Sequence, residues 1–228
     1  MSQRPSPAPA EPPTAPTAPT APTAPTGPTG PAGAAGAGPR RLVLLGPPGS
    51  GKGTQGERLA RALGLPEIST GALFRQQMAQ RTALGAEAQI HIAQGRLVPD
   101  RVTNAMVRDR LAAADAADGF ILDGYPRNLP QVAVLDQILS ERGWGVDAVL
   151  EFRLPEALIV ERLLKRADLE ARQDDTEPVI LRRLAVYRAE TEPIARLYAE
   201  RGALRVIAAE GTVEEVAARV AAALEAAG

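Results

Sequence analysis

A glycine-rich segment at residues 46–54 constrains the fold of this chain more than any other part of it. An apolar run, residues 42–45, leads into this segment, and a stretch with helical character, residues 55–63, leads out of it. Glycines allow a backbone to turn tightly and to direct several N–H groups at one point, where the positive end of the following helix dipole also lies. A strand, a loop and a helix in this order make an anion site that is typical of phosphate binding.

The loop matches the spacing G-x-x-x-x-G-K, in which the lysine carries a positive charge toward the β- and γ-phosphates of a nucleotide. Lys52 is the lysine of this motif. Ser or Thr usually follows the lysine and supplies a hydroxyl group to Mg²⁺, but Gly53 occupies that position here. We therefore expect Thr54, one residue later, to supply the hydroxyl group.

The composition restricts the class of protein to which the chain can belong. The formal net charge is −1, so the chain lacks the overall positive charge that is typical of nucleic-acid-binding domains. It contains no cysteine, which excludes disulfides, thiolate zinc sites and a cysteine nucleophile. No apolar run approaches the roughly 20 residues that span a bilayer, and no apolar stretch of a secretory signal follows Arg4. We expect a cytoplasmic protein that binds neither nucleic acid nor membranes.

Residues 1–39 differ in composition from the rest of the 228-residue chain. Thr-Ala-Pro repeats run from Thr14 to Pro25, and proline at every third position favours polyproline II and opposes a helix. Because this segment has too few apolar side chains to offset the entropy of ordering, we predict a disordered, semi-extended arm. It is either a solvating tail or a ligand for an unknown partner. Residues 40–228 are enough for one domain with a full core.

Strand-like and helical segments alternate over residues 40–228. The expected strands are residues 42–45, 65–69, 119–123, 147–152 and 204–208. The expected helices are residues 52–63, 70–81, 86–93, 99–114, 130–140, 155–166 and 177–201, the last with a bend at Pro193, and a final helix that opens with a capping box at Thr212. This alternation predicts an α/β fold, in which helices cover both faces of a parallel five-stranded sheet. Ligands of such folds bind at the carboxyl ends of the strands.

Asp123 and a set of arginines are the main candidates for chemistry outside the loop. Asp123 ends an apolar strand, where a carboxylate can hold Mg²⁺ directly or through water. Arginine presents a planar fork that matches phosphate oxygens. The candidate arginines are Arg75, Arg127, Arg162, Arg166, Arg172 and Arg183. As a set, they can stabilise the negative charge that a transferred phosphoryl group spreads over three oxygens.

The sequence contains no convincing catalytic base. His91 is the only histidine, and it lies in a stretch with helical character. Transfer to a hydroxyl group normally needs a base near the nucleophile, whereas a phosphate acceptor is already an anion. A set of arginines without a base therefore points to the transfer of a phosphoryl group to another phosphate.

These residues resemble the motifs of the adenylate kinases of the short-lid type. The resemblance covers residues 40–228 and rests on the segments 46–55, 68–75, 95–98, 123–131 and 172–175. It implies a P-loop NTPase type of fold and a monomeric enzyme that uses Mg²⁺ to transfer a phosphoryl group from ATP to AMP, giving two ADP, in adenine nucleotide homeostasis. Residues 69–98 would form a helical AMP-binding segment and residues 167–175 a short lid. Because this lid is too short for the larger type that can bear zinc, no zinc is expected.

The resemblance also implies a role for each candidate residue. ATP would be bound by Gly49, Ser50, Gly51, Lys52, Gly53, Thr54, Arg162 and Gly211. AMP would be bound by Thr70, Arg75, Arg96, Val98, Gly124, Arg127, Gln131, Arg172 and Arg183. The catalytic set would be Lys52, Arg127, Arg162, Arg166, Arg172 and Arg183. Thr54 and Asp123 would hold Mg²⁺ through water.

Two positions depart from the family pattern, and two other functions stay open. Ala72 stands where many members have Asp, which puts one polar contact near AMP or the metal in doubt, and Tyr125 replaces the commoner Phe.

A UMP/CMP kinase shares the fold and most motifs, although the hydroxyl of Thr70 and the amide of Gln131 suit the edge of adenine. A nucleotide-dependent scaffold protein is the other alternative, but it would not require the whole set of arginines.

Overall fold

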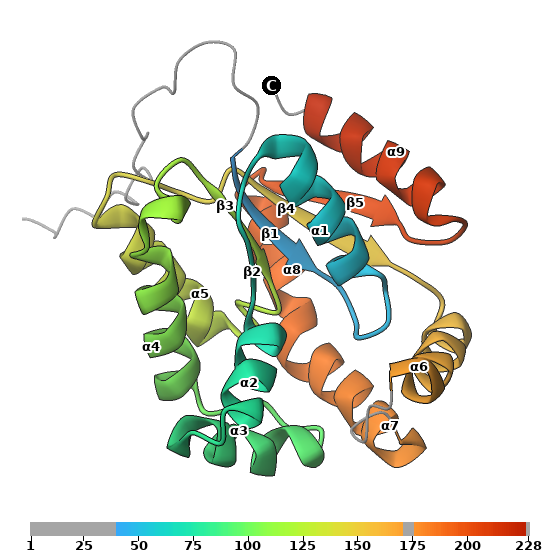
Figure 1. Cartoon of the computed structure of the whole chain (residues 1–228). Helices are drawn as coiled ribbons and strands as arrows, with labels where there is room; N and C mark the ends of the chain where they lie inside the picture. The colour runs from blue at the N-terminus through green and yellow to red at the C-terminus, as the bar shows by residue number, and fades with distance from the viewer. Residues whose placement is uncertain (1–39, 171–175, 227–228) are drawn as a thin grey trace, which may run out of the picture.

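The computed structural model describes the backbone of residues 40–170 and 176–226, and the side chains of these residues except 166–170. Five parallel strands form one sheet in the order β2-β3-β1-β4-β5 (Figure 1). The strands are β1 (Arg41–Leu45), β2 (Glu67–Ser69), β3 (Phe120–Asp123), β4 (Ala148–Arg153) and β5 (Leu204–Ala208). The predicted α/β fold with a parallel five-stranded sheet is confirmed.

Helices connect the strands throughout the described residues. They are α1 (Lys52–Leu63), α2 (Thr70–Ala79), α3 (Ala83–Ala93), α4 (Asp100–Leu111), α5 (Leu129–Ser140), α6 (Glu156–Glu170), α7 (Glu177–Val186), α8 (Glu192–Glu200) and α9 (Val213–Glu225), with a 3₁₀ turn at Ala114–Ala116. Within the described part of the chain, none of these helices is long and apolar enough to cross a membrane.

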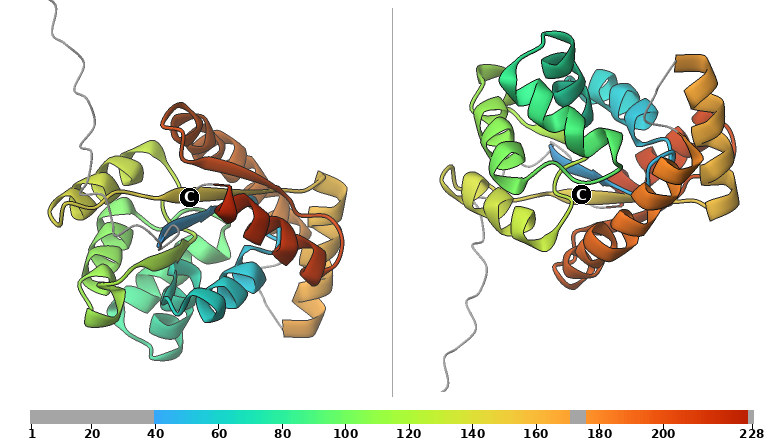
Figure 2. Two further views of the ribbon diagram at one scale, coloured as in Figure 1. Left: turned by 90° about the horizontal axis from the view of Figure 1, so that it is seen from above. Right: turned by 90° about the horizontal axis from the view of Figure 1, so that it is seen from below.

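The helices cover both faces of the sheet (Figure 2). On one face, α4, α5 and α8 pack against Val43 and Leu45 of β1 and their neighbours. On the other face, α1 and α9 pack against Leu42 and Leu44 of the same strand. Successive side chains of a strand point to opposite faces, so a strand that is covered on both faces appears in the sequence as an unbroken apolar run.

The central strand, β1, determines where a ligand can bind. Leu44 lies opposite Asp123 of β3, and Leu45 lies opposite Glu151 of β4. The chain order reverses across β1, because β2 and β3 lie on one side of it and β4 and β5 on the other. In open parallel sheets, a crevice forms at the carboxyl ends of the strands at this point.

The α2–α3 segment packs around a small apolar cluster that it shares with the start of α4. Phe74 of α2 and Ala88 of α3 contact Val98 and Val102, and this cluster is separate from the two cores on the faces of the sheet. In Figure 1, α2 and α3 lie beyond the carboxyl ends of the strands. This segment therefore forms one wall of the crevice.

The structure corrects the predicted boundaries of several helices, including α3, which begins at Ala83 rather than at residue 86. Pro99 is the N-cap of α4 rather than part of its first turn, because its backbone is extended (φ −51°, ψ 137°), and α4 ends at Leu111. The predicted polar break at 167–175 begins later than expected, since α6 continues to Glu170. Residues 171–175 of the predicted lid lie outside the described residues, as do residues 1–39 of the predicted arm.

The predicted interruption near Pro193 takes the form of a π-helical turn at Tyr187–Thr191, between α7 and α8. Proline lacks an N–H group and clashes with the preceding turn, so an interruption on its N-terminal side is expected. The capping box of α9 is confirmed. The N–H of Glu215 donates to Oγ1 of Thr212 at 3.2 Å, and the N–H of Thr212 donates to Oε2 of Glu215 at 2.8 Å.

Candidate active site

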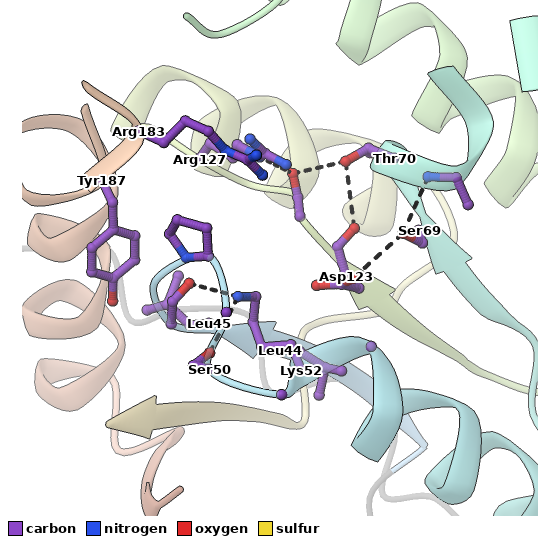
Figure 3. A pocket seen from close by; sticks show the side chains of 18 of the residues that line it. Leu44, Leu45, Ser50, Lys52, Ser69, Thr70, Asp123, Arg127, Arg183 and Tyr187 are labelled. Atoms are coloured by element: carbon purple, nitrogen blue, oxygen red, sulfur yellow. Dashed lines mark hydrogen bonds between the residues drawn. The ribbon is translucent and has the colours of Figure 1, made fainter. Parts of the chain in front are cut away.

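A cavity of about 1040 Å³ opens at the carboxyl ends of the strands. Figure 3 shows side chains from the loop, β3, α2 and α7 that converge on it. The predicted site residues that line the cavity are Gly49, Ser50, Gly51, Lys52, Gly53, Thr54, Thr70, Arg75, Arg96, Val98, Asp123, Gly124, Arg127, Gln131, Arg162, Arg183 and Gly211. Arg166 belongs to α6, but its side chain is not described, and Arg172 lies outside the described residues.

The loop at 46–54 places Lys52 at the first residue of α1. Gly51 precedes it with a φ of +89°, a left-handed conformation that glycine adopts without strain. Nζ of Lys52 donates hydrogen bonds to the carbonyl oxygens of Gly46 and Pro47, each at 2.8 Å. The ammonium group is thus held over the loop, next to the N–H groups at the start of α1 that favour an anion.

Thr54 is the hydroxyl residue of the loop that is exposed to the cavity. A Cβ at Gly53 would meet no atom within 4 Å, so the space around this position does not require glycine. Thr54 is exposed, whereas Ser50 is only 1% exposed. Thr54 is therefore accessible to a ligand in the cavity, and its role toward Mg²⁺ stays a prediction.

Asp123 presents an unsatisfied carboxylate oxygen at the end of β3. Its Oδ2 accepts a hydrogen bond from Oγ of Ser69 at 3.4 Å, whereas its Oδ1 is buried and accepts none from the described residues. A buried carboxylate oxygen without a donor is costly unless a cation compensates for it. This oxygen therefore fits a divalent cation, directly or through water.

A second carboxylate, that of Glu67, lies near Asp123. Glu67 lies on β2 two residues before Ser69 and lines the cavity. Burial and the negative charges of Asp123 and Glu57 raise the pKa of Glu67 from 4.5 to about 7. The acidic side of the cavity thus has more negative charge than the sequence analysis expected, although Ala72 contributes none.

Three arginines from separate elements surround another part of the cavity. Arg127 follows β3 and Arg183 lies on α7 (Figure 3). Arg75 lies on α2 and also lines the cavity. Removal from water and the charge of Arg183 lower the pKa of Arg127, Asp123 opposes this shift, and Arg75 adds to it. Because these cations repel one another, their arrangement favours a ligand group with two negative charges.

Hydrogen bonds fix the position of Arg127. Its Nε donates to the carbonyl oxygen of Gly124 at 2.7 Å, and its backbone N–H donates to Oε1 of Gln131 at 2.7 Å. Oγ1 of Thr191, in the π-helical turn, donates to the carbonyl oxygen of Arg127 at 2.8 Å. The turn between α7 and α8 is therefore tied to the residue that follows β3.

Thr70 and Gln131 are both buried and both engaged with the protein. Oγ1 of Thr70 donates to the carbonyl oxygen of Gly124 at 2.9 Å. Nε2 of Gln131 donates to Oδ1 of Asp100 at 2.6 Å. Each residue is only 1% exposed, but both line the cavity. A ligand at this wall of the cavity can therefore bond only to the donors and lone pairs of the Thr70 hydroxyl and the Gln131 amide that these contacts leave unused.

Arg162 and Gly211 lie on the other side of the loop. Arg162 of α6 donates through an Nη atom to the carbonyl oxygen of Ala209 at 3.2 Å. Gly211 has a φ of +98°, a left-handed conformation that residues with a side chain rarely adopt, and a Cβ there would crowd the carboxylate of Glu215. Glycine is therefore favoured where the chain passes from β5 to α9 along the cavity wall.

The sequence is similar to known proteins over most of the domain. Residues 44–203 match the family model described as adenylate kinase. The chain belongs to the adenylate kinase family. The adenylate kinase of Thermobifida fusca (strain YX) is 49% identical over 185 residues, which cover 81% of this chain and 98% of that relative. That of Mycobacterium tuberculosis (strain H37Rv) is 51% identical over 184 residues, with coverages of 81% and 98%. That of Micrococcus luteus is 50% identical over 180 residues, with coverages of 79% and 88%.

As a member of the adenylate kinase family, the chain is a nucleoside monophosphate kinase, a phosphotransferase that binds nucleotides. The comparisons give no support to the alternative of a UMP/CMP kinase. Adenylate kinases use Mg²⁺ together with ATP, which agrees with the unsatisfied oxygen of Asp123.

Some residues of the site were not found from the sequence. Glu67 had a detectable signal, because it is two residues from Ser69 and so faces the same side of β2. Asp100 and Thr191 had no signal in the sequence that would have identified them. They lie 31 and 64 residues from their partners, Gln131 and Arg127, and only the fold brings them together.

Proposed function

We propose that the chain catalyses the reversible, Mg²⁺-dependent transfer of the γ-phosphoryl group of ATP to AMP, giving two molecules of ADP. One observation carries the proposal: a single cavity contains Lys52 on its loop side and the cluster of Arg75, Arg127 and Arg183 on another. Two separate groups of cations suit two phosphate-bearing substrates, and phosphoryl transfer depends mainly on positioning and charge stabilisation.

ATP occupies the loop side in this proposal. The N–H groups at the start of α1 and the charge of Lys52 bind its β- and γ-phosphates. The residues assigned to ATP are Gly49, Ser50, Gly51, Lys52, Gly53, Thr54, Arg162 and Gly211. The hydroxyl of Thr54 and the carboxylate of Asp123 hold Mg²⁺ through water, and no zinc is required. Bound Mg²⁺ neutralises charge on the transferring phosphates.

AMP occupies the side formed by residues 69–98, β3 and α7. The residues assigned to it are Thr70, Arg75, Arg96, Val98, Gly124, Arg127, Gln131 and Arg183. Its phosphate, a dianion, relieves the mutual repulsion of Arg127 and Arg183. Arg162 and Arg183 stabilise the transferring group, and Arg166 and Arg172 are assigned to the same task from sequence alone.

No general base takes part in this scheme. His91 of α3 is not among the described residues that line the cavity. The acceptor oxygen belongs to a phosphate that is already an anion, so the task of the protein is to bring two anions together and to exclude water. We further infer a cytoplasmic monomer, on the grounds of a cysteine-free chain and a site built from one chain.

The substitution Gln131→Ala tests the placement of AMP. We expect KM for AMP to rise about tenfold, the scale of a lost pair of hydrogen bonds, while KM for ATP stays within about twofold of the wild-type value. Steady-state kinetics with each nucleotide varied in turn measure both constants. A parallel rise of the two constants would contradict the placement.

A further inference from the structure

The amide group of Gln131 is held at both ends. Its Nε2 donates to Oδ1 of Asp100 at 2.6 Å, and its Oε1 accepts the backbone N–H of Arg127 at 2.7 Å. A carboxylate can only accept hydrogen bonds, and a backbone N–H can only donate them. These two partners therefore permit one orientation of the amide, with the nitrogen toward Asp100 and the oxygen toward Arg127.

Asp100 is in turn fixed by its neighbours. It is the first residue of α4, and Nδ2 of Asn128 donates to both of its carboxylate oxygens, each at 3.1 Å. Oδ1 of Asn128 accepts the backbone N–H of Gln131 at 2.8 Å and so caps α5. The network joins the first turns of α4 and α5. Asp100 is not among the described residues that line the cavity, so it acts on a ligand only through Gln131.

The contacts of Gln131 leave a defined pattern for a ligand. An amide has two N–H donors and two oxygen lone pairs, so one donor and one lone pair remain. Adenine presents an amino donor at position 6 beside a ring-nitrogen acceptor, and glutamine pairs with such an edge through both amide atoms. A purine with an oxygen at position 6 presents an acceptor there, which would face Oε1 with the same polarity.

We propose that Asp100 is a positioning residue that makes this site select a 6-amino purine monophosphate. It does so by fixing the Gln131 amide with the oxygen available to the 6-amino group. The inference rests on the proposed role of Gln131 in binding AMP. An acidic residue in the first turn of a helix also stabilises the helix dipole, but that effect does not depend on which base is bound.

The test uses the full chain, saturating ATP, and either AMP or IMP as the phosphoryl acceptor. Asparagine can donate as well as accept, so Asp100→Asn removes one of the two constraints on Gln131. We expect KM for AMP to rise about tenfold, with kcat and KM for ATP within about twofold of wild type. The ratio of kcat/KM for AMP to that for IMP should fall about tenfold. Asp115→Asn is the matched control, because Asp115 pairs with Arg110 at the surface, and it should keep the wild-type ratio.

Two further variants make each outcome decisive. Asp100→Glu keeps a carboxylate that can only accept, and it should retain more of the selectivity for AMP than Asp100→Asn does. A wild-type ratio of kcat/KM in folded Asp100→Asn would overturn the proposal. The failure of both Asp100→Asn and Asp100→Glu to fold would overturn it too, because Asp100 would then act on stability alone. If Gln131→Ala also leaves the ratio unchanged, the proposed placement of AMP fails. If Gln131→Ala lowers the ratio and Asp100→Asn does not, only the inference about Asp100 fails.

Discussion

Lys52 and Lys165 are the only two lysines in the chain, and of these Lys52 lines the cavity. Its ammonium group lies over the loop, where the phosphates of ATP are expected. We predict that Lys52→Ala lowers kcat on the order of 10²-fold or more, the scale of one lost preorganised charge contact. A coupled assay of ADP formation measures this effect. Lys165→Ala, on the exposed side of α6, is the control and should keep the wild-type kcat. A kcat near wild type in Lys52→Ala would refute the phosphate-binding role of the loop.

Glu67 imposes a cost on the folded protein that depends on pH. Burial and the charges of Asp123 and Glu57 raise its pKa from 4.5 to about 7, so the folded state binds the proton more tightly than the unfolded state. The tighter binding of this proton stabilises the folded state. This stabilisation is fully present below about pH 4.5 and is lost as the pH rises through about 7, where Glu67 ionises in the folded protein. Because the side chain is partly exposed, solvent screening limits this loss to about 1 kcal/mol.

We predict that Glu67→Gln raises the melting temperature by about 2–4 °C at pH 8 and changes it little at pH 4.5. The reason is that glutamine has no charge to desolvate and none to repel Asp123. Thermal unfolding in the presence of a chelator measures the shift without metal ions. Glu200→Gln, at an exposed position of α8, is the control, because Glu200 is not among the groups that raise the pKa of Glu67, and it should shift the melting temperature at neither pH. An equal shift of Glu67→Gln at both pH values would count against a titrating Glu67.

At the scale of elements, local signals were sufficient for the strands and for the conformation of the loop at 46–54. The apolar run at 42–45 and the glycines after it lie within a dozen residues of one another, so β1, the loop and the start of α1 could be predicted together. The buried strand that ends at Asp123 carried an equally local signal. The carboxyl-end rule for parallel sheets then placed Asp123 near Lys52.

The π-helical turn at Tyr187–Thr191 and the contacts of Asp100 could not be predicted in the same way. Pro193 indicates only that a helix is interrupted nearby, whereas the π-helical form depends on packing. Thr191 is buried, and its hydroxyl bonds to Arg127 rather than to its own helix. Such pairings arise from tertiary structure, and no local pattern in the sequence identifies them.

We predict that the segment 69–98 closes over bound substrates. Phe74 and Ala88 belong to a cluster that is separate from the cores on the sheet and is shared with the start of α4, whereas Leu73 packs against a sheet core. Much of the segment can therefore move relative to the sheet. Transfer to AMP rather than to water requires a site from which water is excluded. Amide hydrogen exchange should therefore slow across 69–98 when an ATP–AMP bisubstrate mimic binds, whereas exchange in α8, none of whose residues lines the cavity, should change little. Identical exchange across 69–98 with and without the mimic would contradict closure.

At the scale of the whole molecule, the sheet and its two covering layers are a rigid base for a charged cavity. Leu42–Leu45 is buried on both faces, so the loop that follows it leaves from the most protected part of the fold. The arginines come from later elements, α2, α6, α7 and the residues after β3, and reach the cavity only once the sheet is complete. The function therefore depends on the whole domain and not on the loop alone.

The most direct test of this function is an assay of ADP formation from ATP and Mg²⁺ with AMP, CMP or UMP as the acceptor. We predict that AMP supports the formation of two ADP for each ATP consumed, with a kcat/KM at least about tenfold above that of either pyrimidine monophosphate. Uracil presents the opposite hydrogen-bonding polarity to the Gln131 amide, and cytosine presents the same polarity as adenine but on a smaller ring that fills less of the cavity. Without an acceptor, ATP hydrolysis should be slow. Comparable turnover with UMP or CMP, or rapid ATP hydrolysis without any monophosphate, would contradict the transfer to AMP in a site that excludes water.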